Sequence, residues 1–377
     1  MMRIAVIAPY FPAPANSGGR TRIWKLASAL SSRHELHLYA RAFASERSQL
    51  VNDPCLAPYH RIWTHWSILD FITAWRGFRR LRLASSAKLA NQIRKDHRQT
   101  PFDMLLCCHS HTAGVAPLLP DIPMFLDEHN IESRYIRSCH AARRESYFAR
   151  IWERNAWKIA RGVSCVSEAD AKTIGTYCHG NVGVVPNGIS LNEVPFRPAS
   201  ARSSRTILFV GMMSFRPNVR AAKFLVEKVL PGVLREIPDA NLVLCGRDPC
   251  REVLSLAGPN VTVTGTVPSV IPYIENAAVY GNALFEGAGS SLKVPEALAA
   301  GIPLVSTRVG VRGFDLQPGR HYLPAEKPED FTRQILSVLR SSSETDPMTR
   351  LGHEYARSLD WEIIGKRFVD TIESAME

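Results

Sequence analysis

Lys293 and Glu296 stand three positions apart in the stretch GAGSSLKVPEALAAGIPLVS (287–306), so a helix there would place both on one side. Pro295 lacks an N–H group and fits only the first turn of a helix, which is expected to begin near Ser291 or Leu292. Lys293 would lie at the positive end of the helix dipole, where a cation is unfavourable unless an anion such as phosphate is bound. The Glu296 carboxylate could accept hydrogen bonds from two neighbouring ribose hydroxyls. The alternative is a solvated Lys–Glu pair on a helix surface.

Glycines and serines flank this predicted helix. Gly287, Gly289, Ser290 and Ser291 are expected to form an open turn ahead of it, with backbone amides that can donate hydrogen bonds. Gly301 is expected to end the helix as a C-terminal cap. The turn would therefore add backbone donors to the anion site predicted for the helix.

Gly18 and Gly19 form a second candidate anion site. They follow the apolar run RIAVIA (3–8) and stand just before an amphipathic helical pattern. Paired glycines at a helix N-terminus let a ligand approach bare amides, where the helix dipole favours an anion. The alternative is an ordinary turn, since the Rossmann and Walker glycine patterns are both absent.

Short apolar runs alternate with helical patterns along the chain. Strands are predicted at 3–8, 35–40, 103–108, 124–127, 163–167, 182–185, 206–210, 241–245, 261–265 and 303–307, and helices at 20–31, 143–161, 218–230, 292–300 and 328–340. The polar, proline-containing segment 190–206 indicates a linker between two such series. The sequence therefore predicts an α/β fold with two parallel sheets covered by helices, in which ligands bind beyond the carboxyl ends of the strands.

Charge is distributed unevenly over the 377 residues. Residues 1–200 hold 26 Lys and Arg against 15 Asp and Glu, whereas residues 201–377 hold 20 of each. The net charge of +11 therefore lies in the first half, which indicates an anionic partner there. No apolar run is long enough to span a membrane, and no signal peptide is expected. None of the eight cysteines falls in a C-x-x-C pattern, so we expect buried free thiols in a reducing cytoplasm.

The run GSSLKVPEALAAGIPLVSTRVGVRG (289–313) resembles the nucleotide-sugar site of retaining GT-B glycosyltransferases of the family 4 type, the glycosyl transferases of group 1. Other motifs agree in their order along the chain: LDEHN (126–130), VSCVSEADA (163–171), VVPNGIS (184–190), LFVGMMSFRPN (208–218) and the closing helix LDWEIIGKRFVDTIE (359–373). The resemblance implies two Rossmann-like domains that face a central cleft. The N-terminal acceptor-binding domain would span 1–195 and be closed by the helix at 360–377, and the nucleotide-sugar domain would span 205–359.

The resemblance also implies roles for particular residues. Lys293 and Arg216 would bind the diphosphate and stabilise the leaving group without a metal. The amides of Gly18 and Gly19 would contribute from the opposite side once the cleft closes. His129 would contact the sugar or help the developing oxocarbenium charge.

The remaining implied contacts concern the nucleoside part of the donor. Glu296 would hold the ribose, and the loop of Gly246 and Arg247 would pass the base. Ser290, Ser291 and Leu292 would complete the donor-binding turn.

The sequence departs from the family pattern at three places. The first of two glutamates usually found eight positions apart falls on Ala288, although Glu286 is nearby, which leaves the donor-sugar hydroxyl contact open. The usual Arg-plus-Lys pair after the first strand of the second domain is reduced to Arg216. Gly281 and Asn282 are poor strand formers in a segment where the family has an apolar strand.

His129 has alternatives as a catalytic residue. It could instead cap the next helix or pair with Asp127 or Glu128. His109 and His111 also follow a strand, and their spacing suits a metal, but no third ligand of suitable spacing stands out. No D-x-D pair for Mg²⁺ and no Ser-His-Asp elbow is visible. We therefore expect no metal and no cofactor besides the donor substrate.

The segment 60–95 mixes tryptophans and phenylalanines with arginines. This composition suits an interfacial helix on anionic lipid headgroups, and a helix that faces the core with solvated arginines is the alternative.

These observations predict a retaining, metal-independent glycosyltransferase of the cytoplasm, with peripheral contact at the inner membrane face as a further expectation. It would move a sugar from a UDP- or GDP-linked donor to a hydroxyl of a glycolipid or saccharide acceptor in envelope biosynthesis. One alternative is a nucleotide-sugar 2-epimerase of the same fold, with Asp127, Glu128 and His129 as part of its acid/base set. Another is a nucleic-acid-binding protein that uses the basic half, although no nucleic-acid-binding signature is visible.

Overall fold

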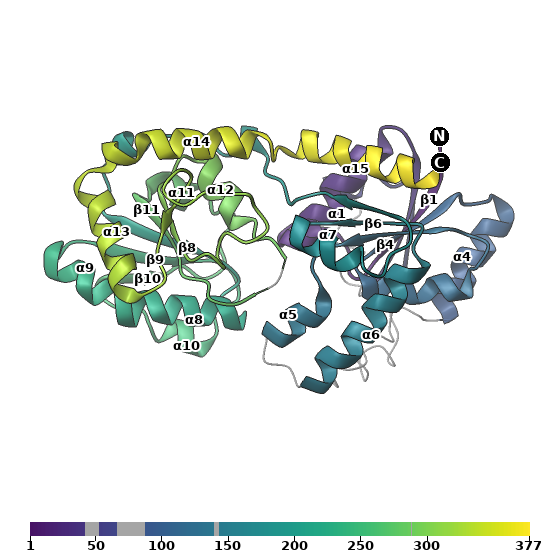
Figure 1. Cartoon of the computed structure of the whole chain (residues 1–377), viewed down its shortest axis with the longest axis horizontal. Helices are drawn as coiled ribbons and strands as arrows, with labels where there is room; N and C mark the ends of the chain where they lie inside the picture. Colours follow the sequence, from purple (N-terminus) through teal and green to yellow (C-terminus); the bar gives the residue numbers. More distant parts are fainter. Residues whose placement is uncertain (42–52, 66–86, 139–142, 288) are drawn as a thin grey trace. The chain divides into compact units, whose positions relative to one another are not determined.

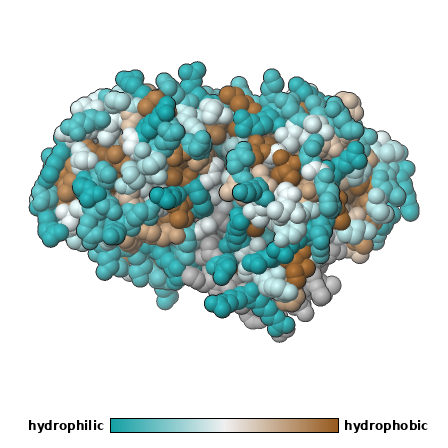
Figure 2. Space-filling view, viewed as in Figure 1, coloured by the Kyte–Doolittle hydropathy of each residue, from teal (hydrophilic) through white to brown (hydrophobic). Residues whose placement is uncertain are grey.

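The computed structural model divides the chain into two α/β units, and it describes residues 1–41, 53–65, 87–138, 143–287 and 289–377. Unit 1 comprises Met1–Asn187 together with Trp361–Glu377, and unit 2 comprises Gly188–Asp360. The division therefore falls just ahead of the segment 190–206 that the sequence indicates as a linker. Figure 2 shows that hydrophilic residues cover most of the viewed face of each unit.

Parallel strands form the sheet of unit 1, in the order β3-β2-β1-β4-β5-β6-β7. The strands are β1 (Arg3–Ala8), β2 (Glu35–Arg41), β3 (Arg61–His65), β4 (Met104–Cys108), β5 (Met124–Glu128), β6 (Gly162–Cys165) and β7 (Asn181–Val184). The helices are α1 (Gly18–Ser31), α4 (Ala87–Gln99), α5 (Glu132–Ser138), α6 (Arg143–Ile159), α7 (Glu168–Ile174) and α15 (Trp361–Met376), with a 3₁₀ segment η3 (Ser110–Leu118). Strand order changes direction between β1 and β4, and ligands of open parallel sheets bind at such a point.

The last helix of the chain, α15, completes unit 1 because small residues let it approach closely. It lies beside α1 (Figure 1), where a Cβ atom on Gly365 would come within 2.6 Å of the Ala29 Cβ atom. Gly162 of β6 leaves room for Ala375 in the same way. A Cβ atom on Gly183 of β7 would overlap Thr371.

Parallel strands also form the sheet of unit 2, in the order β10-β9-β8-β11-β12-β13. The strands are β8 (Thr206–Val210), β9 (Asn241–Cys245), β10 (Val261–Val263), β11 (Val279–Asn282), β12 (Leu304–Ser306) and β13 (Leu323–Pro324). The helices are α8 (Arg216–Phe224), which continues through a π-helical turn into α9 (Leu230–Glu236), α10 (Arg251–Leu254), α11 (Ile271–Asn276), α12 (Lys293–Ala299), α13 (Pro328–Arg340) and α14 (Asp346–Arg357). Here strand order changes direction between β8 and β11.

Alternate residues of β8 enter two different cores of unit 2. Ile207 and Phe209 pack with residues of α8, α9 and α13, whereas Leu208 and Val210 pack with residues of α11, α12 and α14. Successive side chains of a strand point to opposite faces, so this sheet is covered on both sides. The same burial explains why its strands are apolar throughout.

Buried hydrogen bonds explain the strand β11, which the sequence did not predict. Asn282 is fully buried, and its Nδ2 donates to the Ser306 Oγ atom at 3.1 Å and to the Gly310 carbonyl at 3.0 Å. A Cβ atom on Gly281 would make only ordinary van der Waals contact with Leu225 and Ile207. The buried hydrogen bonds of Asn282 therefore outweigh its poor strand propensity.

Several sequence predictions can be compared with this fold. Gly301, with φ of +66°, ends α12 as predicted, and its amide donates to the Leu298 carbonyl. The seven cysteines in the described residues are free and six are buried. Most of the segment 60–95 and Ala288 lie outside the described residues. Among the helices that the structure describes, none is long and apolar enough to cross a membrane.

Candidate functional site

Lys293 and Asn218 meet where the strand order of unit 2 changes direction. Asn218 lies in the first turn of α8, which follows β8, and Lys293 begins α12, which follows β11. The Lys293 Nζ atom donates to the Asn218 Oδ1 atom at 3.0 Å and lies 4.6 Å from the centre of the Phe209 ring. Lys293 is 9% exposed, so its ammonium is largely removed from water and contacts one amide oxygen and an aromatic ring face instead. Among the described residues no carboxylate pairs directly with this ammonium, so a bound anion would stabilise it.

The charge state of this lysine follows from burial. Burial and then the nearby Arg312 guanidinium lower the pKa of Lys293 to about 7, and Glu296 opposes this shift. Burial also raises the pKa of Glu296 to about 7, against the effect of Lys293. Both groups therefore titrate near neutral pH, where a bound anion would favour the charged lysine.

Arg312 is a site residue that sequence reasoning missed, although it lies inside the run 289–313 that carries the family resemblance. Its guanidinium lies against Gly287, whose φ of +142° and missing side chain allow this approach. Its Nη1 atom donates to the Val309 carbonyl at 2.8 Å. Gly313 packs in turn on Ser290, which brings the loop of Arg312 to the predicted donor-binding turn.

Arg216 occupies a different environment from Lys293. Its guanidinium pairs with the Glu252 carboxylate at 2.7 Å, and both side chains are about half exposed, 48% and 49%. No contact between Arg216 and Lys293 is present in the described part of unit 2. Glu286, the possible substitute for the missing glutamate, pairs with Arg220 at 2.8 Å. The structure therefore brings Lys293 to Arg312 and leaves Arg216 at the surface.

The remaining predicted donor residues lie in loops of unit 2. Gly246 has a φ of +147°, and a Cβ atom there would overlap the Gly211 carbonyl, so the loops after β8 and β9 touch. Arg247 is partly buried and its carbonyl accepts from the Met213 amide at 2.8 Å. Ser290 and Ser291 are partly buried, and Leu292 is the N-cap residue of α12. Gly246 therefore has a structural reason to be glycine, independent of any base.

Asp127 and Arg22 form a buried ion pair in unit 1. Two bonds join them, from Nη2 to Oδ1 at 2.6 Å and from Nε to Oδ2 at 3.0 Å. The Ser164 hydroxyl donates to the same carboxylate at 2.7 Å. Burial alone would raise the pKa of Asp127, but Arg22 and His129 hold it well below its usual range. This carboxylate is therefore committed to the ion pair.

His129 lies next to this pair and next to the glycine pair of α1. Its Nε2 atom is 3.0 Å from the Asp127 Oδ2 atom, and its Nδ1 atom lacks a hydrogen-bond partner among the described residues. A Cβ atom on Gly19 would lie 3.7 Å from that Nδ1 atom and would overlap the Tyr10 hydroxyl. Burial lowers the pKa of His129, while Asp127 opposes the shift. Two predicted site features, His129 and Gly19, are thus close together.

A second histidine pair extends this region. The His109 ring lies 3.9 Å from the His129 ring and 5.0 Å from the His111 ring, measured between centres. Glu132, at the start of α5, brings a carboxylate to the pair, and one ligand atom from each of these three residues lies within 4.8 Å of the other two. The sequence did not indicate this third group because it lies 21 positions beyond His111. Such a set could position a hydroxyl or hold a divalent cation.

Glu128 holds the segment that carries these histidines. It is buried and accepts from the Ser110 amide at 3.1 Å and from the Trp157 indole at 2.9 Å. Burial raises its pKa well above the ordinary value, with Glu153 adding to the effect. Glu128 is therefore a buried structural carboxyl group, not an exposed acid or base.

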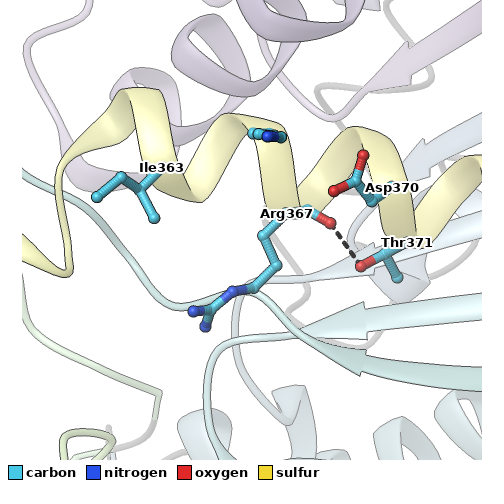
Figure 3. Close-up of a pocket in the computed structure, with 5 residues that line it drawn as sticks. Ile363, Arg367, Asp370 and Thr371 are labelled. Atoms are coloured by element: carbon cyan, nitrogen blue, oxygen red, sulfur yellow. Dashed lines mark hydrogen bonds between the residues drawn. The ribbon is translucent and has the colours of Figure 1, made fainter.

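A surface hollow runs along α15 (Figure 3), bordered by Ile363, Lys366, Arg367, Asp370 and Thr371. The Thr371 hydroxyl donates to the Arg367 carbonyl within the helix at 2.7 Å. None of the predicted site residues borders this hollow. It gives no support to a second active site.

Two family models match the chain. The model described as Glycosyl transferases group 1 matches residues 204–341, and the one described as Glycosyltransferase Family 4 matches residues 16–193. Together they cover most of both units. The chain therefore belongs to the group 1 glycosyltransferases of the family 4 type.

Sequence relatives agree with this class. A phosphatidyl-myo-inositol mannosyltransferase from Mycobacterium leprae is 24% identical over 200 residues, which are 50% of this chain and 53% of that protein. The chain thus spans only about half the length of that relative. An uncharacterised 44.6 kDa protein in the cps region of Klebsiella pneumoniae is 22% identical over 372 residues, 91% of this chain and 92% of that one.

Solved structures show the fold. Sucrose-phosphate synthase from Thermosynechococcus elongatus superposes with a TM-score of 0.77 at 17% identity and covers 99% of each chain. The Anabaena protein HepE, in complex with UDP and glucose, superposes with a TM-score of 0.70 at 13% identity over 99% of this chain and 100% of that one. The fold class is that of the GT-B glycosyltransferases, as predicted.

Proposed function

We propose that this glycosyltransferase transfers a sugar with retention from a UDP- or GDP-linked donor to a hydroxyl of a glycolipid or saccharide acceptor. The observation that carries the proposal is the buried Lys293 ammonium, which has Arg312 nearby and one amide oxygen as a hydrogen-bond partner. A diphosphate would supply negative charge directly beside the Lys293 ammonium. Envelope biosynthesis and a cytoplasmic location with peripheral membrane contact belong to the same proposal.

Residues of unit 2 would bind the diphosphate, the ribose and the base of the donor. Lys293 and Arg312 would bind the diphosphate, and Glu296 would accept from the ribose hydroxyls. Ser290, Ser291 and Leu292 would border the phosphates, and the loop of Gly246 and Arg247 the base. HepE was solved with UDP-glucose and the M. leprae relative is a mannosyltransferase, which supports a nucleotide-sugar donor.

The proposed reaction needs no protein nucleophile. The bond from the anomeric carbon to the leaving phosphate oxygen breaks, and the acceptor oxygen bonds to the same face of that carbon. The acceptor proton passes to the leaving phosphate oxygen. Lys293 and Arg312 would stabilise the charge that develops on the diphosphate. His129, neutral because burial lowers its pKa, would orient the sugar through Nδ1, with the Gly18 and Gly19 amides nearby.

Metal independence is part of the proposal, because Lys293 and Arg312 could supply the positive charge that a metal ion would otherwise provide. A chelator should leave transfer unchanged. Loss of activity on chelation, restored by a divalent cation and abolished by His111→Ala, would instead assign a catalytic metal to His109, His111 and Glu132.

Thermal shift against UDP, GDP, ADP, TDP and CMP tests the donor site. A nucleotide at 100 times its dissociation constant adds about 2.7 kcal/mol of stability, which gives a clear shift. Lys293→Ala should weaken binding of the effective diphosphate far more than binding of its nucleoside. Equal losses for both would contradict the diphosphate assignment.

The 2-epimerase alternative has less support from the structure. Asp127 is committed to Arg22 and Glu128 to Ser110 and Trp157, so neither is placed as an acid or base. Incubation with donor alone separates the two activities, because an epimerase would yield an isomeric sugar nucleotide without an acceptor.

A further inference from the structure

The outward face of α6 exposes apolar side chains. Tyr147, Ile151 and Ile159 are 59%, 41% and 51% exposed. They are three of the eight large hydrophobic side chains exposed in the described part of the chain. In Figure 2 hydrophobic atoms appear among hydrophilic ones in the lower part of the view, where Figure 1 places α6.

The same face is basic. Arg143, Arg144, Arg150 and Lys158 are exposed, and the only other exposed polar residue of α6 is Asn155. The two carboxylates of the helix lie elsewhere. Glu153 is fully buried and accepts from the Ser133 amide at 3.1 Å, and Glu145 is only partly exposed. The exposed residues of α6 thus carry positive charge without negative charge.

Helical spacing places the apolar side chains between the cations. Tyr147 and Ile151 are neighbours four positions apart at the centre of the face. Arg143 and Arg150 flank Tyr147 at four and three positions, and Lys158 continues the row two turns beyond Ile151. From such positions, long basic side chains can keep their charged ends in water while their apolar neighbours enter an apolar environment.

The inward face of α6 makes hydrogen bonds to the rest of unit 1. The Trp152 indole donates to the Ser110 carbonyl at 2.9 Å, and the Ser146 hydroxyl donates to the Ser133 carbonyl at 2.9 Å. Trp157 is 2% exposed. Folding therefore does not explain why apolar and basic residues share the outward face.

We propose that the outward face of α6 docks on an anionic lipid bilayer. Tyr147 and Ile151 enter the boundary between headgroups and acyl chains, while Arg143, Arg144, Arg150 and Lys158 contact lipid phosphates. Nucleic acid would match the cations but gain little from two exposed isoleucines. This surface differs from the segment 60–95 that the sequence indicates. The inference rests on the peripheral membrane contact proposed above, but it does not depend on the proposed donor chemistry.

Co-sedimentation of the full-length protein with vesicles tests the proposal. Vesicles of 70% phosphatidylcholine and 30% phosphatidylglycerol should bind the protein, and pure phosphatidylcholine should bind much less. Removing a cation near a charged membrane weakens binding about fivefold. Arg143→Ser/Arg150→Ser should therefore reduce binding by more than tenfold, and Tyr147→Ser/Ile151→Ser should also reduce it.

Matched variants on other helices serve as controls. Ile363→Ser on α15 removes an exposed isoleucine, and Arg333→Ser/Arg340→Ser on α13 removes two exposed cations. Both should bind like the unmodified protein, and all variants should keep its nucleotide-induced thermal shift. Unchanged vesicle binding by both α6 variants would overturn the proposal and place binding elsewhere, for example in 60–95. Absence of vesicle binding, or α6-dependent binding to DNA but not to vesicles, would overturn it as well.

Discussion

Arg22 and Lys293 are both buried cations, yet their partners differ. Arg22 in unit 1 is 1% exposed and makes two bonds to Asp127, with further bonds to carbonyls such as that of Val185 at 2.9 Å. Lys293 in unit 2 is 9% exposed and donates to one neutral amide oxygen. The first charge is neutralised within the fold, and the second is stabilised only in part. A buried cation indicates a ligand site when no carboxylate bonds to it directly, not when it is merely buried.

The largest expected effect comes from breaking the neutralised pair. Arg22→Met would leave the Asp127 carboxylate buried without its cation and lower the free energy of unfolding by about 3–5 kcal/mol. Chemical denaturation measures this loss. Arg33→Met is the control, because Arg33 is half exposed and its pair with Glu373 at 3.1 Å should contribute at most about 1 kcal/mol. If both variants lost the same free energy of unfolding, the buried pair of Arg22 would be no stronger than an exposed one, and Arg22 could not be described as neutralised within the fold.

The pH dependence of stability should distinguish Lys293 next. Its pKa is near 10.5 when unfolded and about 7 when folded, so between these values the unfolded state binds more protons. Stability from this group therefore rises with pH, by about 1 kcal/mol per pH unit between 7 and 9. The melting temperature of the ligand-free protein minus that of Lys293→Met should increase over this range. A constant difference would mean that Lys293 has an ordinary pKa.

Gly19 tests the approach of α1 to His129. Gly19→Ala would overlap the Tyr10 hydroxyl and cost about 1–3 kcal/mol in stability through overpacking, with a loss of transfer activity. Gly258→Ala is the control, since a Cβ atom there meets open space. If Gly19→Ala matched Gly258→Ala in both stability and activity, the close packing around His129 would be unimportant.

The smallest expected effect belongs to Arg216. Because it forms a half-exposed pair with Glu252, Arg216→Met should change stability by less than about 1 kcal/mol. Its effect on diphosphate binding, measured by calorimetry, should be smaller than that of Lys293→Met. If Arg216→Met lost more diphosphate affinity than Lys293→Met, Arg216 would be a donor-site residue, as the family resemblance implies.

Local patterns predicted much of the fold and only part of the site. Apolar runs and helical periodicity located strands such as β1 and β8, and Pro295 and Gly301 marked the ends of α12. The strand β11 was missed because buried contacts of Asn282 outweigh its propensity. Arg312 and Glu132 were missed for another reason, since long-range folding brings them to the groups they face. Spacing along the chain could not indicate that proximity.

The central claim is that Lys293 lacks an anion that a nucleoside diphosphate supplies. Calorimetric titration at pH 8, with the diphosphate that stabilises the protein and in two buffers of different ionisation enthalpy, measures protons taken up on binding. A free pKa of about 7 leaves Lys293 mostly neutral at this pH, so binding should take up roughly one proton, and Lys293→Met should take up none. Binding without proton uptake, or with the same uptake in the variant, would contradict the account.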